Sequence, residues 1–117
     1  MSEKQPGKYL FVLKNDNPKF IEMPFSIART WVEDKGLDLA VYFMFDAIEV
    51  AKKEYIENAP DIKVLVDYLL AQGVPMYTCG FCTRAYELSG DDLYPGIEVA
   101  NRNIYYAVMI EREAVYY

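Results

Sequence analysis

The chain has 117 residues, of which 53% are apolar and 26% charged, and its formal net charge is -6. This size and composition predict a single globular domain spanning 1–117, built around one core. An acidic surface repels phosphate backbones, so we expect no nucleic-acid partner. The sequence contains no histidine, which excludes Ser-His-Asp and Cys-His catalysis and removes the commonest metal ligand.

The N-terminal segment predicts a cytoplasmic protein. Residues 1–8 are polar and lack the apolar stretch of a secretory signal. No apolar run approaches the ~20 residues that a membrane-spanning helix needs, so we expect no membrane partner. We expect residues 1–7 to form a loose tail. Cytoplasmic thiols are kept reduced, so cysteines there are more often catalytic, redox-active or metal-binding than part of a structural disulfide.

The first half of the chain alternates between strand and helix patterns. An apolar run predicts a buried strand at 8–13, and apolar residues at helical spacing predict a helix within 18–35. A second apolar run predicts a strand at 38–45, and good helix formers predict a short helix at 46–55. An apolar stripe from Ile62 to Leu70 predicts a longer helix that Gly73 closes.

The second half continues the alternation. Apolar runs predict strands at three places: 74–78, 97–100 and 114–117. A short helix is predicted at 83–88. The apolar run at 104–110 suits a strand or a buried helix, and the alternation favours a helix, with Asn101 as its N-cap.

Strand-helix alternation over the whole chain predicts an α/β fold. We expect a three-layer α/β/α sandwich on a mainly parallel five-stranded sheet. Right-handed crossovers place the carboxyl ends of the strands along one edge, which is where sites usually form.

Two cysteines, Cys79 and Cys82, lie at a predicted strand-to-helix junction with Gly80 and Phe81 between them. Unpaired N–H groups and the helix dipole favour negative charge there, and a thiolate is the nucleophilic form of cysteine. Gly80 lets the backbone approach a reacting group closely, and Arg84 adds positive charge nearby. Sulfur chemistry at Cys79 is therefore predicted; the alternative is a buried cysteine that packs as a small apolar residue.

Two further residues are candidates with open roles. Cys82 resolves a disulfide or persulfide on Cys79, assists as a second thiol, or packs against the sheet. Asp46 follows the second strand and could line the same edge as Cys79. A carboxylate there carries a proton or binds a ligand, or it caps a turn or helix.

The C-x-x-C spacing has two familiar interpretations that fit this chain poorly. A thioredoxin-type site normally follows an early strand after aromatic residues, whereas here the pair follows the third predicted strand and Thr78. Zinc takes four ligands, mostly nitrogen or sulfur, and one chain supplies two sulfurs and no imidazole. A zinc or iron-sulfur site shared by Cys79 and Cys82 of two subunits stays open, and otherwise we expect no cofactor.

The segment from Val74 to Arg84 (VPMYTCGFCTR) resembles the DsrE/DsrF/TusD-like family of sulfur-relay proteins. In that family a strand ends in a cysteine, often as C-G-x-C, and a short helix follows. The segments at 43–46 and 92–99 fit the wider family pattern, and the resemblance covers roughly 8–117. The chain departs from the family at Tyr86-Glu87, where many C-G-x-C members have a small residue and a glycine.

The resemblance implies an α/β/α sandwich that forms homo-oligomers, commonly trimers or hexamers. It also implies a persulfide on Cys79, with weaker support for a role of Cys82, and sulfur-donor and sulfur-acceptor proteins as partners. If the protein is an enzyme, it is a persulfide sulfurtransferase. The alternative is a binding or regulatory oligomer of the same fold in which the cysteines are incidental.

Eleven tyrosines are many for this length. Four of them crowd the C-terminus: Tyr105, Tyr106, Tyr116 and Tyr117. Amphipathic aromatic side chains are favoured at protein interfaces, so these residues predict either a subunit contact or packing on the sheet.

Overall fold

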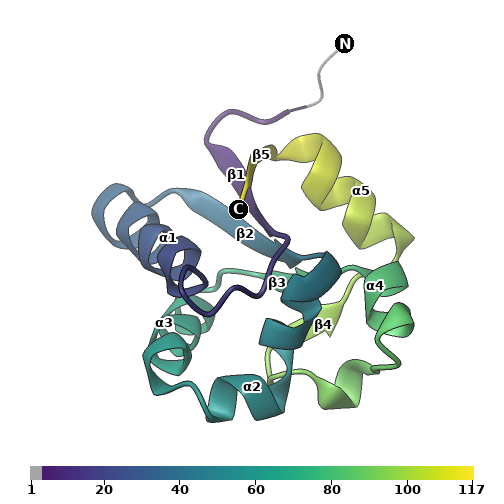
Figure 1. The fold of residues 1–117 in the computed structure, drawn as a ribbon. Coiled ribbons are helices and arrows are strands. Elements are labelled where there is room, and N and C mark those ends of the chain that lie inside the picture. Colours follow the sequence, from purple (N-terminus) through teal and green to yellow (C-terminus); the bar gives the residue numbers. More distant parts are fainter. Residues whose placement is uncertain (1–3) are drawn as a thin grey trace.

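The computed structural model describes residues 4–117 as one α/β unit around a five-stranded, all-parallel sheet (Figure 1). The strand order is β4-β3-β2-β1-β5. The strands are β1 (Lys8–Leu13), β2 (Asp38–Phe43), β3 (Met76–Thr78), β4 (Ile97–Val99) and β5 (Glu113–Tyr116). The predicted fold class is confirmed.

The central strands β1 and β2 are buried because helices cover both faces of the sheet. Their parallel register runs from Lys8 opposite Asp38 to Leu13 opposite Phe43. The last four residues of β1 and the last five of β2 are all buried. Burial on both faces explains why these strands read as continuous apolar runs rather than as alternating patterns.

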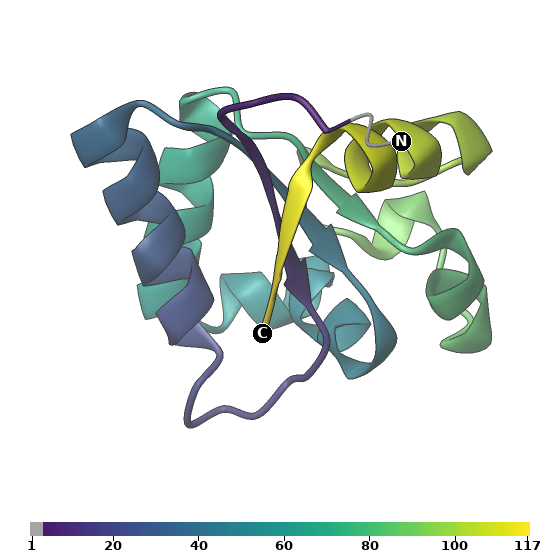
Figure 2. The same cartoon turned by 90° about the horizontal axis from the view of Figure 1, so that it is seen from above.

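Helices form the two outer layers of the molecule. The α-helices are α1 (Glu22–Lys35), α2 (Lys53–Glu57), α3 (Pro60–Ala71), α4 (Gly80–Ala85) and α5 (Arg102–Glu111). Two short 3-10 helices, η1 (Phe45–Ala51) and η2 (Gly90–Asp92), connect them. Figure 2 shows α1 and α3 on one side of the sheet and α4 and α5 on the other.

Two hydrophobic clusters hold these layers together. The larger lies between the sheet and the α1, η1, α2 and α3 side of the molecule. The smaller brings α5 onto the other face through Leu10, Val12, Ala40, Tyr42, Ala100 and Val108. The half-buried Cys79 packs against both clusters, so it lies at the margin of the sheet where the two clusters meet.

The prediction of one continuous helix at 46–55 is wrong. The chain forms the 3-10 helix η1 and then the separate α2, with Lys52 in an extended conformation between them. Lys52 is held there by a β-bridge to Leu93 and by an ion pair with Glu49 at 2.8 Å. These contacts come from a distant segment and from the helix itself, and they interrupt an otherwise helical pattern.

The short helix predicted at 83–88 begins earlier, at Gly80, and ends earlier, at Ala85. It starts directly after Cys79, whose side chain caps it. Glu87 has a φ of 58°, in the left-handed region that terminates helices and that glycine normally occupies. The chain therefore keeps the turn that ends the helix, with glutamate instead of glycine at the left-handed position.

Lys4 and Gln5, in the described part of the predicted loose tail, contact the end of α5. The Lys4 ammonium donates to the carbonyl oxygens of Met109 and Arg112 at 2.6 and 2.8 Å. The Gln5 N–H donates to the Glu111 carbonyl oxygen at 2.8 Å, so this segment is fastened to the end of α5. Residues 1–3 of the predicted tail lie outside the described residues. Within 4–117, no helix is long and apolar enough to cross a membrane.

Candidate functional site

The carboxyl ends of three neighbouring strands place Cys79. The Cys79 N–H donates to the Phe43 carbonyl oxygen at 2.9 Å, at the end of β2. On the other side, the Ala100 N–H donates to the Thr78 carbonyl oxygen, also at 2.9 Å. Cys79 is thereby fixed at the edge of the sheet between the ends of β2 and β4, which is where the sequence predicts it.

The Cys79 thiol takes the place of a helix-capping side chain. Its Sγ accepts a hydrogen bond from the Cys82 N–H at 3.5 Å. Serine, threonine, asparagine or aspartate usually accepts that bond through oxygen. The Thr83 side chain is buried beside the junction and donates to the Cys79 carbonyl oxygen at 2.6 Å. The first turn of α4 therefore holds both the thiol and its backbone.

The two cysteines have different surroundings. Cys79 is half-buried, whereas Cys82 is 7% exposed and belongs to the larger core cluster. Burial raises the pKa of the Cys82 thiol, although a hydrogen bond from the Phe45 N–H at 3.3 Å opposes that shift. Phe45 has a φ of 51°, which is uncommon and strained for a residue other than glycine. Cys82 is thus a second thiol close to Cys79 that is buried and less accessible to solvent.

An open depression of about 350 Å³ surrounds the exposed side of Cys79. Helix α4 supplies Gly80, Phe81 and Arg84, and the N-cap and first residue of α5 supply Asn101 and Arg102. The remaining lining residues are Tyr42, Ala100, Tyr105 and Tyr106. Phe81 is 75% exposed, so an apolar ring stands free at the rim beside the thiol.

Four of the predicted site residues line this depression together: Cys79, Gly80, Phe81 and Arg84. Neither Arg84 nor Arg102 forms an ion pair with any residue of 4–117, whereas the other two arginines, Arg29 and Arg112, each pair with a carboxylate. Two unpaired guanidinium groups beside the thiol make this part of an acidic protein locally positive.

Asp46 does not line the depression. Its carboxylate accepts a hydrogen bond from the Tyr86 hydroxyl, and this contact raises the pKa of Tyr86 to about 12. This hydrogen bond links η1 to the C-terminal end of α4 and helps to hold the short helix in place. A binding or proton-carrying role for Asp46 remains a prediction.

Six lining residues were not predicted as site residues from the sequence: Tyr42, Ala100, Asn101, Arg102, Tyr105 and Tyr106. Asn101 was predicted only as an N-cap, which is confirmed by its bond from the Ile104 N–H at 2.9 Å. Arg102 follows it, and the rule that parallel strands end at one edge would have placed both beside Cys79. Tyr42 lies inside a buried strand, where nothing in the pattern separates a site residue from a core residue.

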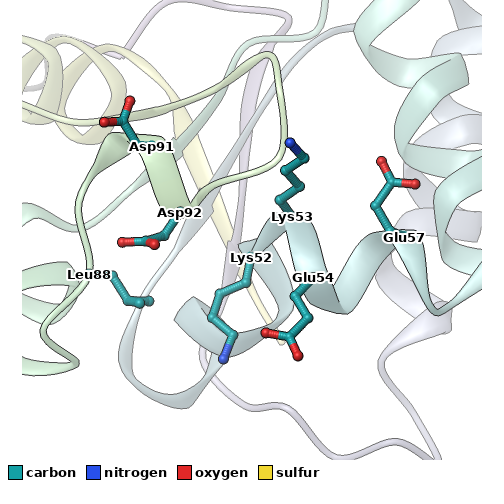
Figure 3. Close-up of a pocket in the computed structure, with 7 residues that line it drawn as sticks. All are labelled: Lys52, Lys53, Glu54, Glu57, Leu88, Asp91 and Asp92. Carbon is teal, nitrogen blue, oxygen red and sulfur yellow. The ribbon is translucent and has the colours of Figure 1, made fainter.

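A second depression, of about 390 Å³, holds no thiol. Figure 3 shows its side chains, which come from Lys52 and α2 and from the segment around η2. The charged groups are Lys52, Lys53, Glu54, Glu57, Asp91 and Asp92. Both signs of charge are mixed there, which is typical of a solvated surface rather than of a site for one kind of ion.

The cysteine pair of one chain does not form a metal centre within the described residues. No group of three or more Cys, Asp or Glu side chains in 4–117 is arranged to hold a metal ion. Zinc in structural sites takes four ligands. A site that pools Cys79 and Cys82 from two subunits stays a prediction.

The fold and the site define a class: an α/β/α protein with an accessible thiol at the carboxyl edge of a parallel sheet. The chain belongs to the DsrE/DsrF-like family, whose model matches residues 8–115. The family resemblance predicted from the segment around Cys79 is confirmed. A search of curated proteins finds no match.

Solved structures share the fold over nearly the whole chain. A protein of unknown function, MTH1491 from Methanobacterium thermoautotrophicum, is 21% identical with a TM-score of 0.75, covering 93% of this chain and 97% of its own. The ychN protein of E. coli is 21% identical with a TM-score of 0.72, covering 94% and 99%. BT1422 from Bacteroides thetaiotaomicron is 10% identical with a TM-score of 0.65, covering 94% and 95%. At these identities the similarity concerns the fold.

Proposed function

We propose that this protein is a cytoplasmic sulfur carrier that accepts sulfur as a persulfide on Cys79 and passes it on. The observation that carries the proposal is the contrast between two nearby thiols. Cys79 is half-buried and lines an open depression, while Cys82 is buried behind it. Membership of the DsrE/DsrF-like family supports the same chemistry.

The loading step is an exchange of sulfur between thiols. The Cys79 thiolate attacks the outer sulfur of a donor persulfide, R–S–SH, and forms Cys79–S–SH while the donor leaves as the thiolate R–S⁻. The bond that breaks is the donor sulfur–sulfur bond, so no external oxidant or reductant is needed. The Cys82 N–H already donates to the Cys79 sulfur, and Arg84 and Arg102 line the same depression, so these groups would favour an anionic sulfur there.

Unloading has two routes in this proposal. An acceptor thiolate attacks the outer sulfur of Cys79–S–SH, takes it as a persulfide and restores the Cys79 thiolate. Alternatively, the Cys82 thiolate attacks the inner sulfur, which gives a Cys79–Cys82 disulfide and releases hydrosulfide. Burial raises the pKa of Cys82, so the second route is slow near neutral pH and leaves time for an acceptor to bind.

We also propose that the carrier works as a homotrimer or homohexamer with protein donors and acceptors. Phe81, Tyr105 and Tyr106 expose large aromatic surfaces around the depression. Such side chains are enriched at protein contacts. Light scattering coupled to gel filtration would measure the subunit number, and a monomer would contradict this part of the proposal.

The test of the carrier function is a sulfur-trapping experiment. The folded protein is incubated with a low-molecular-weight persulfide, and intact-mass and peptide spectrometry locate the added sulfur. We expect wild type and Cys82→Ser to gain one sulfur on Cys79, with Cys82→Ser keeping it longer. Cys79→Ser serves as the matched control and should gain none. A wild-type protein that gains no sulfur on Cys79 would contradict the proposal.

The alternative function is a binding or regulatory oligomer in which the cysteines are incidental. The exposed aromatic rim favours it as much as it favours a carrier, because it requires a partner and no chemistry. Sulfur trapping separates the two functions, since a protein of the second kind remains unloaded while it still assembles.

A further inference from the structure

Tyr42 is a buried tyrosine that lines the same depression as Cys79. The side chain is 1% exposed, among the largest fully buried side chains in 4–117, and it belongs to the smaller core cluster. A buried tyrosine hydroxyl normally finds a hydrogen-bond partner. Besides burial, the Cys79 thiol is one of the causes of the raised pKa of Tyr42 and lines the same depression, so the two groups are neighbours.

The sheet brings these two groups to the same place. Tyr42 of β2 lies directly opposite Tyr77 of β3, so both side chains are on one face. Cys79 is two residues beyond Tyr77 and returns to that face, because side chains alternate along an extended chain. The Cys79 N–H bond to Phe43 fixes the spacing, and Tyr42 and Cys79 both line the depression.

The hydroxyl of Tyr42 keeps its proton over the whole neutral range. Burial, followed by the neighbouring Cys79 thiol, raises the pKa of Tyr42 well above its usual value. The Tyr105 ring lies beside the Tyr42 ring, with 6.1 Å between the two ring centroids, and helps to cover Tyr42. A protonated, shielded phenol beside a thiol can act only as a donor when that thiol becomes an anion.

We propose that the Tyr42 hydroxyl donates a hydrogen bond to the sulfur of Cys79 and so makes this thiol, rather than Cys82, the reactive one. The inference deepens the carrier function proposed above, because the same bond would hold the anionic persulfide sulfur. Tyr42 keeps its proton throughout, so the sulfur exchange balances as written above. Among residues 4–117, Cys82 accepts a hydrogen bond from the Phe45 N–H and none from a tyrosine hydroxyl.

The experiment measures the pH profile of Cys79 alkylation by iodoacetamide, with Cys82→Ser as the background so that one thiol reacts. We expect Tyr42→Phe to move the midpoint of the profile upward by roughly one pH unit, because the thiolate loses a charge-assisted hydrogen bond. Tyr77→Phe is the matched control, since Tyr77 lies opposite on the same face but does not line the depression. Its midpoint should stay at the background value.

The other titratable or charged groups near Cys79 are the same in both variants. Arg84, Arg102, Tyr105 and Tyr106 line the same depression, and Cys82 is serine in the background. The difference between the two profiles therefore reports Tyr42 alone. A Tyr42→Phe midpoint equal to that of Tyr77→Phe would overturn the inference. If Tyr42→Phe does not fold, a ring-fluorinated tyrosine placed at position 42 keeps the ring and strengthens the donor. The midpoint should then fall, and an unchanged midpoint would overturn the inference equally.

The outcome is independent of sulfur carriage because alkylation needs no persulfide. A protein that fails the sulfur-trapping test can still show a profile that depends on Tyr42, in which case only the carrier function is lost. A protein that loads sulfur normally but ignores the Tyr42 substitution would lose only the present inference.

Discussion

The close approach of two backbone segments at Gly80 gives the sharpest mutational prediction for the site. A Cβ added to Gly80 would lie 3.0 Å from the Ala100 carbonyl oxygen and 3.4 Å from Nη1 of Arg84. The arginine can move away, but the Ala100 carbonyl is backbone, and its residue is bonded to Thr78 across the sheet. The substitution Gly80→Ala therefore has to push α4 away from the end of β4 by a few tenths of an ångström.

The size of the effect follows from two opposing contributions. Inserting a methyl group into a packed position costs about 1–3 kcal/mol. Replacing glycine by alanine in a helix returns about 0.5–1 kcal/mol, since the unfolded chain has less freedom to lose. We expect a net loss of about 0.5–2 kcal/mol in the free energy of unfolding, measured by urea denaturation, together with slower alkylation of the displaced Cys79.

Gly90→Ala is the matched control for this prediction. A Cβ at Gly90 meets nothing within 4 Å, and its φ lies outside the left-handed range. That variant should be as stable as wild type or more stable by about 0.4–1 kcal/mol. If Gly80→Ala proves as stable as Gly90→Ala, the contact with Ala100 does not restrict this position and the account of Gly80 is refuted.

Two further predictions concern neighbouring features. Glu87→Gly should raise the stability to urea by roughly 0.5–1 kcal/mol, because Glu87 occupies a left-handed φ of 58° that glycine adopts at no steric cost; a loss of stability would contradict the strain assigned to that turn. Replacing Arg84 or Arg102 by Gln should slow the reaction of Cys79 with an anionic methanethiosulfonate relative to a cationic one, by roughly two- to three-fold for each arginine at low salt. An unchanged ratio of the two rates would show that these arginines do not influence the thiol.

Much of the fold was predictable because the chain alternates regularly and its strands are buried on both faces. The strand at 8–13 follows directly from a local pattern, whereas the helix after Asn101 follows from the alternation of elements. The errors arose where distant contacts decide the local structure. Nothing near Lys52 in the sequence indicates its bridge to Leu93, which separates η1 from α2.

The site was predictable as far as its residues are neighbours in the sequence. Cys79, Gly80, Phe81 and Arg84 share one junction, and a single motif indicates them all. Tyr42 of β2 lines the depression, and the Phe45 N–H at the start of η1 donates to the Cys82 sulfur. Their contribution depends on the register between β2 and β3, and a sequence without a known register does not contain that information.

The inequality of the two thiols, however, follows from where α4 begins. With Gly80 as the first helical residue, Cys82 and Thr83 lie on the buried side of the helix, and Phe81 and Arg84 lie on the exposed side. A helix that began at Thr83 would have left Cys82 in a loop with no defined side. The Cys79 side chain caps α4 and stays half-buried at the start of the helix, whereas the Cys82 side chain, three residues further on, lies on the buried side. The thiol of Cys79 is therefore partly accessible because it is the cap, and no larger movement of the protein is needed to expose it.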